Sequence, residues 1–166
     1  MNLCDLIPRM KHSTRWFSVF LIAFTALAWA GGDKKIAQVS FHIETEANDN
    51  PKMIFSHEIL GKERYFRRMS EISSSDFVAF SPFPSDDQTS YGMTIQLKEV
   101  AGQRLTAVTT SSQGKLLVCQ AFGRVVDAVM IDRPVNDRTI IVWKGLTLDE
   151  IRELDKVVPR IGEKKK

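Results

Sequence analysis

Residues 116–158 constrain the fold of this chain more than any other stretch. Residues 116–122 form a nearly continuous apolar run, which is typical of a strand covered on both faces. A tight turn at Gly123 leads into a segment rich in β-branched residues at 125–131, and residues 139–143 form a third apolar run. This order predicts a three-stranded antiparallel meander.

A helix with a capping box follows these strands. The Thr147 hydroxyl is placed to accept from the Glu150 amide, while the Glu150 carboxylate accepts from the Thr147 amide. Leu146 and Ile151 are spaced as a hydrophobic staple around this cap, and Pro159 is expected to end the helix. The predicted apolar stripe of the helix consists of Leu148, Ile151, Leu154 and Val158.

Residues 1–30 have the pattern of a secretory signal peptide. A basic segment precedes an apolar run at residues 16–30, which ends in Ala28-Trp29-Ala30. The run is shorter than the roughly 20 apolar residues that a bilayer-spanning helix needs. We therefore expect an exported protein, periplasmic or secreted, without a membrane span after cleavage. Retention of the segment as an anchor is the alternative.

Residues 31–161 are long enough for a single domain with its own core, and the basic tail at residues 162–166 is expected to be disordered. The start codon stays open between Met1 and Met10. The formal charge of +3 is too small, and too evenly spread, to predict nucleic-acid or membrane binding by itself. Cys119 is the sole cysteine after the predicted cleavage site, and its apolar neighbours predict a buried packing residue.

Residues 37–44 alternate between apolar and polar side chains, which predicts a half-buried strand. His42 lies on the polar side of this pattern and is expected to be solvated. A loop is expected at residues 46–51, where asparagine, aspartate and proline favour turns.

Residues 53–60 and 63–68 predict a hairpin with Gly61-Lys62 as its loop. Its second arm combines cations with two adjacent aromatic side chains, which suits an anionic or extended partner. The alternative is an edge strand whose charges protect it against aggregation. The candidate partner-binding residues are Arg64, Tyr65, Phe66, Arg67 and Arg68.

The middle of the chain predicts a short helical turn at residues 73–80, with a serine cap and Asp76 near its positive end. A strand is expected at residues 91–97, followed by a weak helix whose apolar face includes Val100 and Val108 and which ends before Gly114. Three aromatic residues in this part of the chain are expected to belong to the core: Phe77, Phe80 and Phe83.

From residue 91 onward, the layout is similar to the head subdomain in the first periplasmic domain of SecD and SecDF, subunits of the protein-export translocase. The resemblance rests on the entry at residues 109–115, the turn at Gly123, Pro134 after the second run, Gly145, and the capped helix that Thr147 begins. It implies an α+β fold, mainly an antiparallel sheet with two helices packed on one face, and a core at about residues 72–158. The family carries transmembrane helices with charged residues for proton coupling, and this chain has no second apolar segment. The chain therefore resembles a free-standing exported relative of the head.

The leading hypothesis is a non-enzymatic binding module of the cell envelope that engages a polypeptide or protein partner. The alternative is a small structural or enzyme-inhibitory envelope protein with a folded partner. A small hydrolase built from His57 with Glu44 or Glu58 ranks last. No metal or cofactor is predicted, since the chain lacks a Gly-rich phosphate loop and Cys/His metal spacing.

Overall fold

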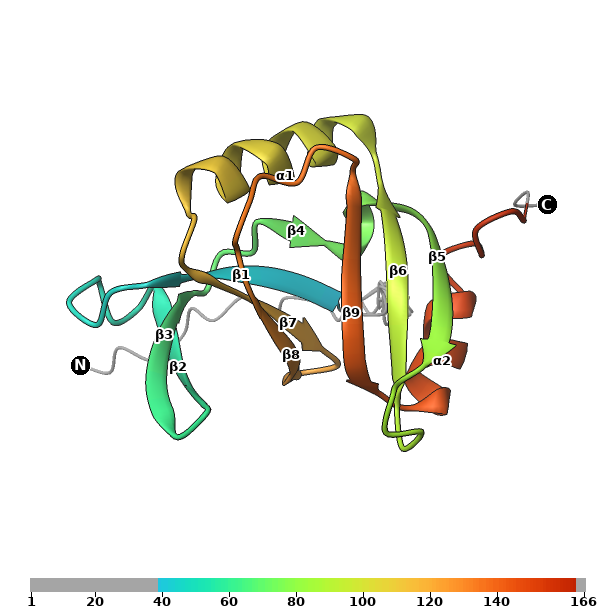
Figure 1. The fold of residues 1–166 in the computed structure, drawn as a ribbon, viewed down its shortest axis with the longest axis horizontal. Helices are drawn as coiled ribbons and strands as arrows, with labels where there is room; N and C mark the ends of the chain where they lie inside the picture. The colour runs from blue at the N-terminus through green and yellow to red at the C-terminus, as the bar shows by residue number, and fades with distance from the viewer. Residues whose placement is uncertain (1–38, 164–166) are drawn as a thin grey trace, which may run out of the picture. The chain divides into compact units, whose positions relative to one another are not determined.

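Two antiparallel sheets are formed by residues 39–163, the part of the chain that the computed structural model describes (Figure 1). The first sheet has the strand order β2-β3-β1-β7-β8, and the short β4 also pairs with β1. The second has the order β5-β6-β9. The predicted signal peptide and residues 164–166 lie outside the described residues.

The strands of the first sheet are β1 (Val39–Thr45), β2 (Ile54–Ile59), β3 (Lys62–Arg67), β4 (Ile72–Ser73), β7 (Leu116–Ala121) and β8 (Arg124–Met130). Those of the second are β5 (Phe77–Pro84), β6 (Tyr91–Leu97) and β9 (Thr139–Leu146). The helices are the single 3-10 turn η1 (Ser74–Asp76), α1 (Glu99–Ser111) and α2 (Leu148–Asp155).

One apolar core is shared by both sheets and both α-helices. Phe41 of β1, Ile95 of β6 and Val142 of β9 are buried in it, together with Leu105 of α1 and Leu154 of α2. Each sheet is apolar on one face and each helix along one stripe, and these apolar sides pack against one another to form the core. The predicted α+β class, mainly antiparallel with two helices, is confirmed.

The predicted three-stranded meander is wrong in its last strand. β8 pairs with β7 as expected, but β9 pairs with β6 in the second sheet. The connection between β8 and β9 holds the chain away from a tight hairpin, because the Val135 amide donates to Thr109 of α1 and the Val135 carbonyl accepts from Thr106. β9 therefore leaves β8 and runs antiparallel to β6 in the second sheet.

The predicted hairpin is present, but its loop lies one residue earlier. Ile59 pairs with Lys62, so the two loop residues are Leu60 and Gly61, with φ of 53° and 73°. Positive φ at both positions is the geometry of a type I′ turn, which matches the twist of the two strands. The turn geometry outweighs the poor fit of leucine to this conformation.

The helical turn predicted at residues 73–80 extends only over η1. The Ser73 amide donates to the Asp76 carboxylate at 2.9 Å, as the predicted cap requires. Residues from Phe77 onward form β5, which tolerates its two prolines because it lies at one end of its sheet. Phe77 and Phe80 are buried, as predicted.

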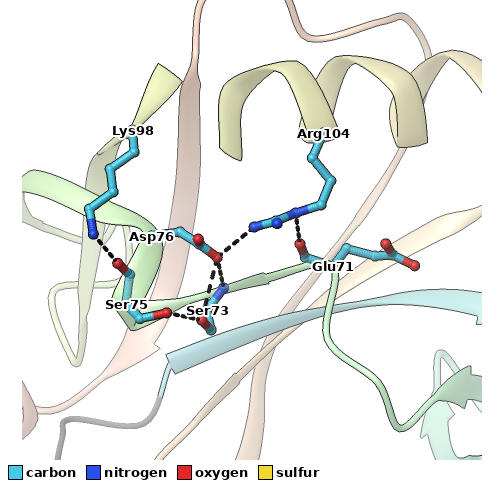
Figure 2. A network of polar contacts seen from close by, with 6 residues as sticks. All are labelled: Glu71, Ser73, Ser75, Asp76, Lys98 and Arg104. Atoms are coloured by element: carbon cyan, nitrogen blue, oxygen red, sulfur yellow. Dashed lines mark hydrogen bonds and ion pairs between the residues drawn. The ribbon is translucent and has the colours of Figure 1, made fainter. Parts of the chain in front are cut away.

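A polar network joins η1 and the residue before β4 to α1 and to Lys98 (Figure 2). The Arg104 guanidinium donates to the Asp76 carboxylate at 2.8 Å and to the Glu71 carbonyl at 2.7 Å. Lys98, which precedes α1, donates to the Ser75 carbonyl. These contacts hold a helix whose composition is intrinsically weak, since Gly102 and several threonines lie within it.

His42 is buried, so its predicted solvated position is wrong. Its Nε2 lies 2.8 Å from the Ser40 hydroxyl, and its Nδ1 lies 2.8 Å from the Arg67 carbonyl. The Phe55 ring of the hairpin meets the imidazole edge-on at 5.3 Å. The hairpin thus covers the polar side of β1, and burial lowers the pKa of His42.

The α2 capping box is confirmed, with the Thr147 amide 2.8 Å from the Glu150 carboxylate and the Glu150 amide 3.3 Å from the Thr147 hydroxyl. Leu146 and Ile151 are both buried, as the staple predicts. Leu148 is exposed and does not belong to the buried stripe.

Two glycines with similar backbone angles are expected to differ in how much an alanine costs. Gly145 has φ of +93° and an added Cβ would lie 2.5 Å from the Val126 carbonyl oxygen, whereas Gly123 has φ of +86° with open space around it. We expect Gly123→Ala to lower the free energy of unfolding by about 1 kcal/mol, and Gly145→Ala by about 3 kcal/mol because strain and a backbone clash add. Denaturant unfolding of both variants measures the difference, and equal losses would contradict the close approach of β8 and β9.

Candidate functional site

The outer edge of β9 has main-chain groups that are free to pair. Within residues 39–163, β9 forms a ladder with β6 alone. The Trp143 amide points away from β6, since it donates to the Asp127 carboxylate of β8 at 2.7 Å. Alternate residues of a strand present their amides to the same side, so the Ile141 amide also points away from β6. The outward amides of Thr139 and Trp143 donate to the Asp137 and Asp127 carboxylates. Ile141, between them, therefore presents the outward amide with which no other strand in the described part of the chain pairs.

β8 faces this edge and approaches it closely at one end only. The close end is held by three contacts: the Asp127–Trp143 hydrogen bond, the packing of Gly145 on the Val126 carbonyl, and a hydrogen bond from Arg124 to the Gly145 carbonyl at 2.7 Å. The Arg124 guanidinium also pairs with Glu150 of the α2 cap. These contacts join the two sheets where β8 begins and β9 ends.

The other end of the gap between β8 and β9 is open. A cleft with a volume of about 610 Å³ lies there, bounded by α1, the ends of both strands and the connection from Ile131 to Asp137. Leu105, Leu117 and Ile140 form part of its apolar floor, while Asp132 and Arg133 bring charges to its rim. This volume is within the usual range of ligand-binding clefts.

Apolar side chains stand exposed beside the cleft. Met130 of β8 is 65% exposed, Trp143 of β9 is 56% exposed and Ile141 is 37% exposed. The Trp143 ring meets the Phe83 ring edge-on at 6.3 Å, and the Phe83 ring in turn lies against Gly92, where an added Cβ would be 2.5 Å from it. Exposed apolar groups that gather in this way mark interaction sites more often than isolated ones do.

The opposite edge of the second sheet is already covered. The Phe80 amide of β5 donates to the Pro159 carbonyl at 3.1 Å, and the Ile161 amide donates to the Phe80 carbonyl at 2.9 Å. The chain after α2 therefore pairs with β5 as a short extra strand would. Protection of β5 and exposure of β9 make the β9 edge the place where this sheet can accept another strand.

The stretch at residues 62–68, predicted as a sheet margin, is an inner strand with most of its groups engaged. β3 lies between β2 and β1. Phe66 is fully buried and stacks on Phe55 at 5.6 Å, so it cannot contact a partner. Arg64 pairs with Glu44 at 2.7 Å, and Arg67 with Glu71 at 3.7 Å.

The other two candidates, Tyr65 and Arg68, are also partly engaged. The Tyr65 hydroxyl donates to Glu63, whose hydrogen bond and charge raise the tyrosine pKa. The Arg68 amide donates to the Met53 carbonyl, and its side chain lies at the surface. Main-chain pairing with a partner is blocked at Tyr65 and Phe66, which already pair with β1. Contact through the exposed cations stays a prediction.

The residues of the hydrolase alternative are not brought together. His57 and Glu58 are neighbours on β2, so their side chains point to opposite faces of the sheet. The Glu44 carboxylate is occupied by Arg64 and by the Leu116 amide at 2.9 Å. Among residues 39–163 there is no group of three potential metal ligands, and no helix there is long and apolar enough to cross a bilayer.

The residues that the sequence did not identify are Met130, Ile141 and Trp143. Residues 140–143 are all apolar, and only Ile140 and Val142 face the core. An uninterrupted apolar run is typical of a strand covered on both faces. On a strand whose outer face stays open, the same run is a signal for a binding surface.

No known family model matches the chain, and no match was found among curated proteins. Solved structures of SecDF do match, and two of them have a TM-score of 0.51 and 17% identity to this chain. The fold is SecDF-like. One SecDF structure, described as a membrane component that enhances protein export, is matched over 71% of this chain and 60% of its own. The other, SecDF in a super-membrane-facing form, is matched over 75% of this chain and 19% of its own.

Cys119 lies on β7, at the inner side of the gap between β8 and β9. It is expected to react slowly with thiol reagents. Burial raises the pKa of its thiol, and the nearby charge of Asp127 adds to this effect. The thiolate is the reactive form, so labelling of the native chain should proceed much more slowly than labelling in denaturant. Mass spectrometry of the Cys119 peptide over time measures both rates, and similar rates would show that the core opens readily.

Proposed function

We propose that this domain is a non-enzymatic binding module of the cell envelope, which holds extended polypeptide segments by strand addition at β9. The observation that carries the proposal is the free outer edge of β9 beside a cleft rimmed by exposed apolar side chains. Likeness in fold to SecDF, a component that enhances protein export, agrees with a polypeptide partner and an exported location.

An added strand would form main-chain hydrogen bonds with the Ile141 amide and carbonyl. Side chains of an extended segment alternate between two faces. On one face they would lie beside Ile141 and Trp143, and on the other they would enter the cleft above Leu105 and Leu117. The proposed ligand is therefore an unfolded segment with apolar residues at alternate positions.

The free energies expected for hydrogen bonds and for apolar burial indicate that side-chain contacts decide the affinity. Each net hydrogen bond contributes about 1 kcal/mol, so two or three of them do not offset an association cost of at least about 4 kcal/mol. Burial of apolar surface contributes about 25 cal/mol per Å², so a few hundred Å² over Trp143, Ile141 and Met130 supply the remainder. Binding is expected to be reversible and tolerant of sequence.

A structural or inhibitory protein with a folded partner is the alternative function. A folded partner would bury the same exposed side chains without requiring the amide edge of β9. The two functions therefore differ in whether the main chain of β9 is needed.

Ile141→Pro tests this difference. Proline removes the outward amide, whereas the ladder with β6 uses the amides of Ile140 and Val142 and stays intact. We expect Ile141→Pro to reduce binding of a carboxymethylated, permanently unfolded model protein by about tenfold or more, and Ile141→Val to change it little. Fluorescence anisotropy measures both affinities.

Folding of each variant is checked by its denaturant midpoint. A folded Ile141→Pro variant that binds the unfolded protein as well as the parent does would contradict strand addition at β9. Selective binding of one folded envelope protein, with no affinity for unfolded chains, would favour the alternative.

A further inference from the structure

We propose that His42 is a pH-sensitive latch for the β2–β3 hairpin, which stays closed on β1 while the imidazole is neutral and opens when the ring gains a proton. The latch consists of the His42 ring on β1, the Arg67 carbonyl of β3 and the Phe55 ring of β2. Opening would uncover Phe66, which is fully buried in the closed hairpin. The latch is separate from the β9 edge and stands whether or not that edge binds polypeptide.

The hairpin is joined to the rest of the first sheet over a short length. β3 pairs with β1 at Phe66 and Tyr65, and β2 pairs with β3 alone in the described part of the chain. Arg64 of β3 adds an ion pair with Glu44 of β1, but a partly exposed ion pair contributes little to stability. The contacts of His42 are therefore a substantial part of the attachment.

The two hydrogen bonds of His42 fix the tautomer of its ring. A carbonyl oxygen can only accept, so the Nδ1 atom, which lies 2.8 Å from the Arg67 carbonyl oxygen, carries the proton. The Nε2 atom of the neutral ring is then an acceptor, and it accepts from the Ser40 hydroxyl oxygen 2.8 Å away. The neutral imidazole thus satisfies both of its neighbours.

A second proton, on Nε2, would place a full charge on a residue that is only 4% exposed. The Phe55 ring lies 5.3 Å from the imidazole, so the hairpin itself covers the ring. Burial lowers the pKa of His42 and outweighs the opposing effects of the Arg67 hydrogen bond and the Glu71 charge. Opening would return the ring to water, so the open hairpin binds the proton more tightly than the closed one does.

The other charges around His42 do not titrate in the same pH range. They form two ion pairs: Arg64 with Glu44, and Arg67 with Glu71. Carboxylates and guanidinium groups keep their charges between pH 5 and pH 7. β7, which pairs with β1 on its other side, contains no charged residue, and His57 of β2 is exposed. His42 is therefore the group through which mild acid acts on the closed hairpin.

The direction of the pH dependence follows from the difference in proton affinity. A solvated histidine has an ordinary pKa of about 6.5, so the open hairpin takes up a proton at a higher pH than the closed one does. Closure is fully favoured above this pH and weakens as the pH falls below it. One proton changes the ratio of closed to open hairpin by at most about tenfold per pH unit. The loss ends where the pH reaches the lowered pKa of the closed state.

Amide hydrogen exchange tests the proposal in residues Asp33–Lys166, a compact unit with its own core. The Arg68 amide donates to Met53 beside β2, so the alternating Tyr65 amide is directed at β1 and reports on opening. We expect exchange at Tyr65, corrected for its intrinsic rate, to speed up roughly tenfold between pH 7 and pH 5. The Ile95 amide of the central strand β6 should stay protected.

His42→Asn should remove this pH dependence, because its side-chain amide can donate to the Arg67 carbonyl and does not titrate. The matched control is His57→Asn, which removes the exposed histidine of the same hairpin and should keep the pH dependence of the parent. A nuclear magnetic resonance titration of the parent should show that the His42 ring gains its proton below the ordinary histidine pKa.

Equal corrected exchange at Tyr65 at pH 7 and pH 5 would overturn the proposal, and so would a pH dependence that His42→Asn retains. Equal acceleration at Tyr65 and Ile95 would overturn it in favour of unfolding of the whole domain. If His42→Asn does not fold, the parent decides the question, since a His42 ring that titrates at or above the ordinary histidine pKa would also overturn it.

Discussion

The close approach of β8 and β9 is the constraint on which the rest of this structure depends. Gly145 lies against the Val126 carbonyl where no side chain fits, and the Asp127 carboxylate accepts from the Trp143 amide. These contacts join two sheets that share no continuous ladder. Because the strands meet at one end only, the other end leaves a cleft and an unpaired edge. The proposed binding site is thus a consequence of how the two sheets are joined.

The second sheet leaves its β9 edge open but covers its other edge, at β5. Pro159 and Ile161 hydrogen-bond to Phe80 of β5, and the prolines of β5 limit further pairing. Exposed edges favour aggregation, and proteins usually cover them or place charges along them. An open edge beside Trp143 and Met130 departs from this tendency, and a site that binds extended segments explains the departure.

Local signals in the sequence predicted local structure well. The Thr147–Glu150 capping box, the β2–β3 hairpin and the burial of Cys119 each depend on neighbouring residues, and each is present. The partner of β9 and the burial of His42 depend on segments far apart in the chain, which periodicity does not reveal. The site escaped prediction for the same reason, since the exposure of Ile141 and Trp143 follows from which sheet β9 joins.

Amide exchange at Ile141 tests the central claim most directly. In the free domain the Ile141 amide faces outward and should exchange quickly, whereas the Ile140 amide is directed at β6 and should be protected. We expect that a saturating unfolded polypeptide slows exchange at Ile141 and leaves Ile140 unchanged, as followed by nuclear magnetic resonance. Saturation of the domain with no change at Ile141 would contradict strand addition at β9.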